Sequence, residues 1–434
     1  MKPQIFCSLI LLSTLSLAQP RSNSAPQDAK VEKPVIAPTK PIALMGGKIE
    51  TPSGIIESGV ILIDGSTITY VGKGDNIRIG DVTKIDCTNK VIYAGFCDPY
   101  VTRGLSLPEA KENEIRDTNT NAPASMRAHH RKVVRPDVKS ADFINMKGVT
   151  EPYQKSGYTT LALANSVGVL RGPSPIIHNL TGETKGILIK DNAFQVASIA
   201  SGGGFGGYPG STFASMAVFR QTMNDAATYP LNSDVGLKEI NEALAPVLAG
   251  TVPLTFFADD NRTILRSLQL CQEYGVRPIL AYAREAYRVL DQIKASKASL
   301  IVSPAIGKEP TELSYNYPIN KVLMDEEKAN WTTRAQNIIE VSKAGIPFAF
   351  TASASAMSEF YDGLRWLNAK GLDRKEILNG LTLYPAQILG ISDKFGSLET
   401  GKTANITIMS GDFLAKSSVV TGIVVNGKYI EVKL

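Results

Sequence analysis

Histidine is the scarcest catalytically versatile residue in this 434-residue chain, which contains three. His129 and His130 are adjacent, and His178 follows the apolar run Pro175-Ile-Ile. A site that needs four separate histidine ligands is therefore arithmetically impossible. A single histidine can act as a general base, but the sequence offers His178 no nucleophile partner. All three are weak catalytic candidates; the alternatives are a hydrogen-bonded structural role for His178 and a solvent-exposed loop for the pair.

Charged residues lie near several expected strand ends. Asp98, Glu285 and the pair Asp259-Asp260 are acidic, and Arg103 and Arg284 are basic. Two adjacent carboxylates are typical of a solvated turn, and an acid/base pair would require that they meet in space. The two arginines could meet an anionic ligand.

Two glycine-containing motifs need their context before they indicate chemistry. Residues 396–403 match the phosphate-binding pattern G-x-x-x-x-G-K-T, but a strand rather than a helix is expected after them, which argues against nucleotide binding. Residues 201–210 are glycine-rich and could form a lid, but the pattern favours a tolerated surface loop.

Composition excludes several classes of protein. The chain is 43% hydrophobic and 20% charged, which suits a globular core and excludes disorder or a disulfide scaffold. Its net charge of +5 comes without a long basic tract, so we expect no nucleic-acid partner. Outside Cys7 the cysteines are Cys87, Cys97 and Cys271, for which we expect three buried thiols; a Cys87–Cys97 disulfide is the alternative.

The N-terminus predicts export. Lys2, a short apolar run and small residues at Ser16 and Ala18 form a signal-peptide pattern over residues 1–18. Residues 19–41 are rich in proline and read as a linker. No later stretch is long and apolar enough for a transmembrane helix. We therefore expect a periplasmic or secreted protein without a transmembrane segment.

The rest of the chain divides into three textures. Short β-rich runs fill 42–94, strand-like and helical runs alternate over 95–390, and β-rich runs return over 391–434. The pattern predicts an α/β fold: a (β/α)8 TIM-like barrel plus a small β-sandwich domain formed by both chain ends. Asp64-Gly65 and Asn426-Gly427 are the expected hairpin turns.

Several local phrases together resemble the amidohydrolase superfamily, in particular its exported imidazolonepropionase-like branch. The phrases are Val91–Asp98, Leu381–Gly390, Gly396–Lys402 and Val425–Lys428. Active members of that family hold one or two divalent metals at the carboxyl ends of the barrel strands, where the metal activates a water and an aspartate moves the proton.

The resemblance implies ligand positions, and this sequence departs from the family at each of them. The family expects histidines after strands one, five and six, and an aspartate after strand eight. The residues found at the matching positions are Tyr100, Thr102, Phe257, Tyr282 and Ser353. Phenyl rings and neutral hydroxyls are poor ligands for divalent metals.

We therefore expect a protein of this family without metal-dependent hydrolysis, acting as a ligand- or partner-binding pseudoenzyme with no cofactor. The partner could be a second copy or an active relative, and the ligand a small molecule. The alternative is an active hydrolase of peptide or non-peptide C–N bonds, such as cyclic amides, with a rearranged site. Zinc or another divalent metal would be implied in that case alone, and His129, His130 and His178 would be the candidate residues.

Overall fold

The computed structural model describes residues 40–74, 80–108, 131–200, 208–232, 238–312, 320–353 and 356–433. The predicted signal peptide, almost all of the linker, the glycine-rich stretch 201–207 and the pair His129-His130 lie outside these ranges. Contacts divide the chain into units 1–39 and 40–434, and everything below concerns the second unit. No helix in the described ranges has the length and apolar character needed to cross a membrane.

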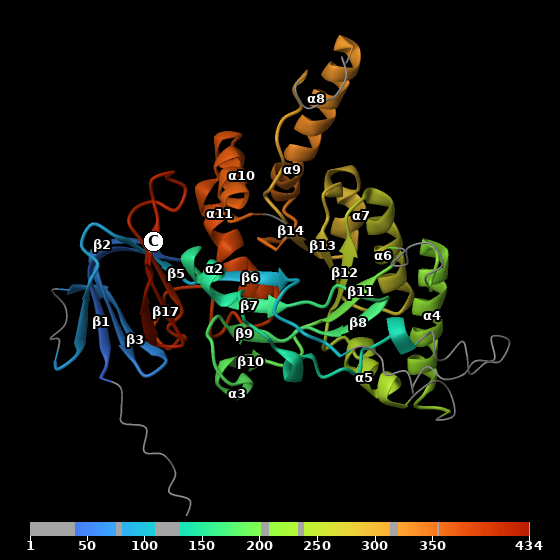
Figure 1. The fold of residues 1–434 in the computed structure, drawn as a ribbon, viewed down its shortest axis with the longest axis horizontal. Helices are drawn as coiled ribbons and strands as arrows, with labels where there is room; N and C mark the ends of the chain where they lie inside the picture. The colour runs from blue at the N-terminus through green and yellow to red at the C-terminus, as the bar shows by residue number, and fades with distance from the viewer. Residues whose placement is uncertain are drawn as a thin grey trace, which may run out of the picture. The chain divides into compact units, whose positions relative to one another are not determined.

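Strands from both ends of the described chain form one mixed sheet, seen at the blue and red ends of the ribbon in Figure 1. The strand order is β18-β17-β16-β5-β1-β2-β3, with β4 paired to β1, so β5 and β16 join the two halves. The strands are β1 (Ile42–Thr51), β2 (Gly54–Asp64), β3 (Thr67–Lys73), β4 (Thr83–Asp86), β5 (Val91–Ala94), β16 (Ile406–Met409), β17 (Val420–Val425) and β18 (Lys428–Glu431).

Turn chemistry sets the two hairpins. Asn426 and Gly427 connect β17 to β18 with φ of 51° and 77°, the left-handed conformations that a type I′ turn requires. The other predicted turn is displaced by one residue: Asp64 pairs with Thr67, so the loop is Gly65-Ser66 rather than Asp64-Gly65. Gly65, at φ 55°, takes the left-handed position.

Two further sheets contain the parallel strands. The smaller has the order β10-β9-β7-β6 and the larger β15-β14-β13-β12-β11-β8. The strands are β6 (Phe96–Val101), β7 (Tyr158–Leu163), β8 (Leu170–Pro173), β9 (Ile176–His178), β10 (Leu188–Lys190), β11 (Gln195–Ser198), β12 (Leu254–Ala258), β13 (Pro278–Tyr282), β14 (Ser299–Val302) and β15 (Phe348–Phe350). β6 pairs with β7, and β11 through β15 with one another, in parallel, whereas β8, β9 and β10 make antiparallel pairs.

Helices follow most of these strands, as the alternating texture predicts. They are α2 (Thr150–Lys155), α3 (Thr184–Ile187), α4 (Thr212–Thr228), α5 (Lys238–Leu248), α6 (Asn261–Glu273), α7 (Leu290–Ala295), α8 (Lys321–Ala335), α9 (Asn337–Lys343), α10 (Met357–Ala369), α11 (Arg374–Leu381) and α12 (Leu383–Ile388), with 3₁₀ turns η3 (Ser140–Phe143) and η4 (Ala286–Arg288). η4 and α7 are separate elements, because buried Val289 between them has φ −140° and ψ 34°, which are not helical angles.

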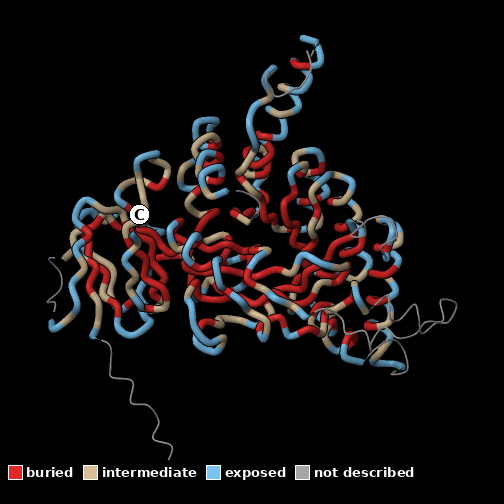
Figure 2. The backbone as a smooth tube through the Cα atoms, viewed as in Figure 1, coloured by how far each residue is buried: buried red, intermediate tan, exposed pale blue. Residues whose placement is uncertain are grey.

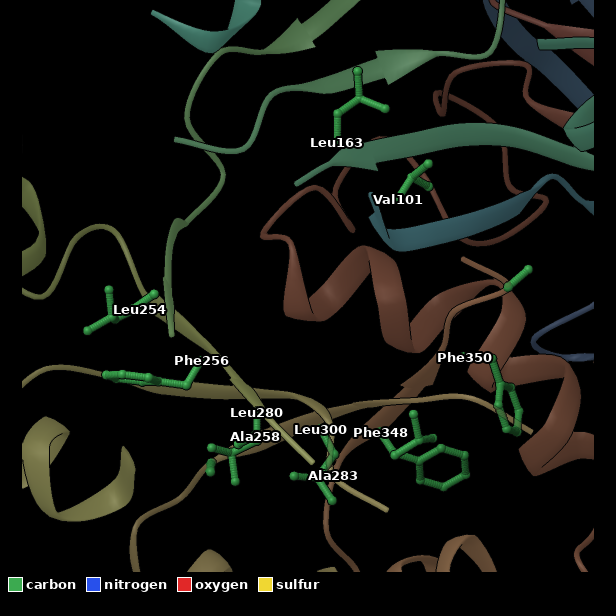
Figure 3. Close-up of a cluster of buried hydrophobic side chains, with 14 of the residues drawn as sticks. Val101, Leu163, Leu254, Phe256, Ala258, Leu280, Ala283, Leu300, Phe348 and Phe350 are labelled. Carbon is green, nitrogen blue, oxygen red and sulfur yellow. The ribbon is translucent and has the colours of Figure 1, made fainter. Parts of the chain in front are cut away.

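The strands bury both of their faces, as Figure 2 shows by the red tubes of the central strands. Leu280, Leu300 and Phe348 belong to one apolar cluster, part of which is drawn in Figure 3. The alternate residues Ala281 and Ala349 belong to a second cluster. This alternation is the period of two that a strand with two covered faces requires.

Two sequence-level alternatives are settled by local contacts. Cys87, Cys97 and Cys271 are buried free thiols, so no Cys87–Cys97 disulfide is formed. The phosphate-binding motif is followed by strand β16, and the Lys402 ammonium binds the Ser392 carbonyl and the Ser397 hydroxyl at 2.9 and 2.6 Å. The Lys402 ammonium therefore binds groups of the neighbouring turn.

Candidate active site at the carboxyl ends of the parallel strands

The five predicted positions come together at one edge of the parallel strands. Tyr100 and Thr102 lie at the end of β6, Phe257 and Tyr282 at the ends of β12 and β13, and Ser353 shortly after β15. We call these five residues the carboxyl-edge cluster. Their strands run in parallel, and β6 packs beside β15, so residues up to 253 positions apart become neighbours.

Two of these residues form a hydroxyl pair. The Thr102 and Ser353 hydroxyl oxygens are 2.8 Å apart, and the Thr102 amide donates to the Ser353 hydroxyl at 2.9 Å. The Ser353 amide in turn donates to the Thr351 hydroxyl, which donates to the Tyr100 carbonyl. Both hydroxyls are therefore engaged in joining the end of β6 to the end of β15.

The other three form an aromatic chain. The Tyr100 and Tyr282 rings meet edge to face with centroids 5.9 Å apart, and the Tyr282 and Phe257 centroids are 5.1 Å apart. Tyr100 is 1% exposed and Tyr282 8%. Burial raises the pKa of Tyr282 to about 12 and also raises that of Tyr100, so both phenols are neutral at physiological pH.

Backbone strain marks the end of β13. Tyr282 has φ 73° and Ala283 φ 32°, both in a region that residues with a Cβ avoid. The Ala283 carbonyl is held by the Asn337 side-chain amide at 3.0 Å, and the Ala283 amide donates to the Ala258 carbonyl. Strain of this kind concentrates at functional sites.

Asp98 supports the cluster from within β6. Its carboxylate is fully buried and accepts hydrogen bonds from the Tyr100 and Ala352 amides at 3.0 and 2.9 Å. Burial raises its pKa to about 6, although these hydrogen bonds favour the charged form. The residue therefore ties β6 to β15 and titrates near neutrality.

A cavity of about 490 Å³ opens beside Tyr282. The other sequence-predicted charges line it: Arg284 makes a bidentate ion pair with Asp259 at 2.5 and 2.6 Å, and Glu285 accepts from the Asn261 amide. Asp260 also lines it and caps α6 by accepting from the Arg262 and Thr263 amides. These acids thus serve local structure, and Arg284 already has a carboxylate partner.

One charged residue of this edge carries no sequence signal. Arg171, in β8, places its guanidinium 5.9 Å from the centre of the Phe257 ring, and its Nε donates to the Gly168 carbonyl at 3.0 Å. The short apolar segment around Arg171 gives no sign that its side chain lies over Phe257, which belongs to strand β12.

His178 lies away from the cluster. It pairs with Thr160, near the start of β7, whereas Tyr100 and Thr102 lie at the ends of their strands. The ring is 7% exposed, lies 5.8 Å from the Phe395 ring, and leaves Nδ1 without a hydrogen-bond partner among the described residues. Burial lowers its pKa to about 4, so it is neutral at physiological pH.

The donor set of the cluster does not fit a divalent metal. Phe257 has no donor atom, the two tyrosine rings pack against each other, and the Thr102 and Ser353 hydroxyls bind each other. Within the described ranges no three histidine, cysteine or acidic side chains gather as a metal site would need.

Comparisons with known proteins agree with this architecture. Residues 285–430 match the amidohydrolase family. An amidohydrolase from Thermotoga maritima MSB8 superposes with a TM-score of 0.74 at 19% identity, over 90% of this chain and 100% of that one. A Xaa-Pro dipeptidase with methionine bound in its active site superposes at 0.53 and 15% identity, over 90% of this chain and 100% of its own. A prolidase complexed with N-methylphosphonate-L-proline superposes with a TM-score of 0.52 at 13% identity, over 91% of this chain and 100% of that one.

The family match over residues 285–430 and the shared fold agree with the resemblance found in the sequence: the chain has an amidohydrolase-type α/β fold built from mixed sheets.

Proposed function

We propose that this protein is exported, binds a small molecule at its carboxyl edge, and does not hydrolyse it by divalent-metal chemistry. The observation that carries the proposal is the occupation of all five family ligand positions by one packed cluster of phenol, phenyl and hydroxyl groups. A metal needs lone pairs directed at one point, and these groups are directed at one another.

The finer architecture is part of the same proposal. Strands of both parallel sheets, including β6, β7, β11, β13, β14 and β15, contribute to one inner apolar cluster with members such as Cys97, Val196 and Ala349. The Thr351 hydroxyl and the Tyr100 carbonyl connect β15 to β6. These contacts support a (β/α)8 barrel. A separate core with Leu44, Ile61 and Ile406 supports a sandwich-like terminal domain.

The test is metal content. Purified mature protein is incubated with zinc and manganese, desalted and measured by mass spectrometry. We expect below roughly a tenth of an equivalent for the natural chain. The variant Tyr100→His/Thr102→His/Phe257→His/Tyr282→His/Ser353→Asp, checked for folding by circular dichroism, should retain about one equivalent or more.

The matched control is His178→Gln, which changes a histidine outside the cluster and should leave metal content unchanged. Close to one tightly held metal per natural chain would overturn the proposal. N-terminal sequencing of protein recovered from a bacterial periplasm tests export: the mature chain should begin at Gln19, and an intact Met1 would contradict cleavage after Ala18.

A further inference from the structure

Arg171 is a cation at the carboxyl edge for which the described residues supply no anionic partner. The residue is half-buried, its guanidinium lies over the Phe257 ring, and burial lowers its pKa. Among the described residues no carboxylate forms an ion pair with it, and its Nε donates to the Gly168 carbonyl. The other arginine of this edge, Arg284, is neutralised by Asp259. A charge that is removed from water without a counter-ion is costly and is retained where it binds something.

The Tyr100 hydroxyl is the second, independent feature. It is buried, and no partner lies within ordinary hydrogen-bond limits of its oxygen. Arg171 is the group nearest to serving it: the charge of its guanidinium and a donated side-chain hydrogen bond oppose the pKa rise that burial causes in this phenol. A guanidinium can donate to the phenol oxygen but cannot accept the phenol's own proton. Because most buried hydroxyls have a partner, the missing group is an acceptor.

The surroundings of the two groups are apolar. Phe257 lies beneath the guanidinium, and Tyr282 links Phe257 to Tyr100. Phe257 and Arg171 are partly exposed whereas the Tyr100 hydroxyl is buried, so a ligand would approach from the side of Phe257 and Arg171. A charged group flanked by aromatic rings suits a molecule with an anionic end and an apolar body.

We propose that Arg171 and the Tyr100 hydroxyl form a subsite for the carboxylate of a small aromatic or apolar acid, whose body packs on Phe257 and Tyr282. Guanidinium and phenol are both donors at neutral pH, and a carboxylate supplies two acceptor oxygens and the missing charge. The inference rests on the proposed function, since it names the ligand class of the same edge.

The experiment is calorimetric titration with benzoate, using benzamide as the neutral analogue of the same shape. We expect benzoate to bind the natural protein and benzamide to bind at least about tenfold more weakly. Arg171→Met keeps an unbranched apolar stem but removes the guanidinium and its charge, and should reduce benzoate affinity by about tenfold or more while leaving benzamide binding unchanged.

Tyr100→Phe separates a binding role from a structural one. Removing a hydroxyl that has no partner should raise the melting temperature of the free protein. If the hydroxyl contacts the ligand, the same variant should also bind benzoate several-fold more weakly. Arg284→Gln is the matched control, because it removes an edge arginine that is already paired, and it should bind benzoate as the natural protein does.

The outcomes are distinguishable. Equal binding of benzoate and benzamide, or benzoate binding unchanged in Arg171→Met, overturns the inference while low metal content leaves the proposed function standing. A metal-loaded natural protein overturns the proposed function whatever benzoate does. Loss of benzoate binding in Arg284→Gln but not in Arg171→Met would assign the anion to the neighbouring cavity and contradict this subsite.

Discussion

The carboxyl edge differs from the contact between the terminal sheet and the helical part, which we call the seam and define by Glu50, Tyr93, Arg374 and Asp412. At the seam, Arg374 of α11 donates to Glu50 of β1 at 2.5 and 3.0 Å and to Asp412 at 2.7 Å. Although burial opposes its charge, these carboxylates raise the pKa of Arg374. A part-buried charge network therefore joins the seam, whereas the carboxyl-edge cluster is made of hydroxyls and rings, beside an exposed ion pair and an arginine that has no carboxylate partner among the described residues.

The close contacts of the two regions differ in the same way. A Cβ on Gly95, beside the seam, would collide with the Thr159 side chain and the Asn405 backbone. The Gly95 amide donates to the Asn405 carbonyl there. At the edge, by contrast, the close contacts are between bulky rings, as in the edge-to-face pair of Tyr100 and Tyr282. The two regions are thus built from different interactions, and because a site is grafted on a fold, the chemistry of the edge can change while the fold persists.

The largest effect on stability is expected from a variant that breaks the ion pairs of the seam. Arg374→Ala leaves the Glu50 carboxylate, 10% exposed, without its partner. We expect the free energy of unfolding to fall by about 2–3 kcal/mol, at the low end for a buried pair because the Arg374 side chain is 34% exposed. Urea unfolding at pH 7 measures it.

The matched variant at the edge is Arg284→Ala. Its ion pair with Asp259 is equally bidentate, but the arginine side chain is 64% exposed. Exposed pairs of this kind contribute about 0–1 kcal/mol. Equal losses in the two variants would contradict the distinction between the regions.

The sequence predicts the terminal sheet and the strand–helix alternation better than it predicts the edge or the seam, for a physical reason. Hairpins, the strand after the phosphate-binding motif and the strand–helix alternation depend on neighbours in the chain, as Asn426-Gly427 illustrates. The edge depends on contacts between residues such as Thr102 and Ser353, 251 positions apart. The five positions of the carboxyl-edge cluster are predicted from the family resemblance. That resemblance gives no expectation for a residue outside these positions, such as Arg171.

Arg171 shows what was missed. Its neighbours Val169, Leu170 and Gly172 read as a short apolar strand, and its functional interest arises from Phe257 and Tyr100, which come from other strands. His178 shows the opposite case. Its residue type suggests a catalytic role, but its register opposite Thr160 places it away from the carboxyl ends of β6 and β7.

The second prediction sharpens the comparison through His178. Its pKa in the folded protein is about 4, below the ordinary value of 6.5, because burial disfavours the charged form. As the pH falls below 6.5, the unfolded chain binds a proton at His178 but the folded chain does not, so the free energy of unfolding falls. Between pH 7 and pH 5 this group should remove about 2 kcal/mol.

His178→Gln should abolish that part of the pH dependence, measured as the change in unfolding free energy between pH 7 and pH 5. All other titrating groups are shared by the two proteins, so the difference belongs to the histidine. Identical pH dependence in both would show that His178 is already solvated in the folded state.

The third and smallest effect belongs to the edge and has the opposite sign. Asp98 has a folded pKa of about 6, raised by burial from an ordinary value of 3.8. Between these values the folded protein holds a proton that the unfolded chain has released, so stability rises as the pH falls. From pH 7 to pH 5 the gain should be about 1 kcal/mol.

The gain is best read in the His178→Gln background, where the opposing slope has been removed. There, stability should increase from pH 7 to pH 5, and adding Asp98→Asn should flatten the response, because the amide cannot titrate. Asn can also accept through its single oxygen from one of the two amides of Tyr100 and Ala352, so the double variant should be less stable at every pH. A slope that persists after Asp98→Asn would place the titrating group elsewhere and would leave β6 and β15 joined by a carboxylate that stays charged across this range.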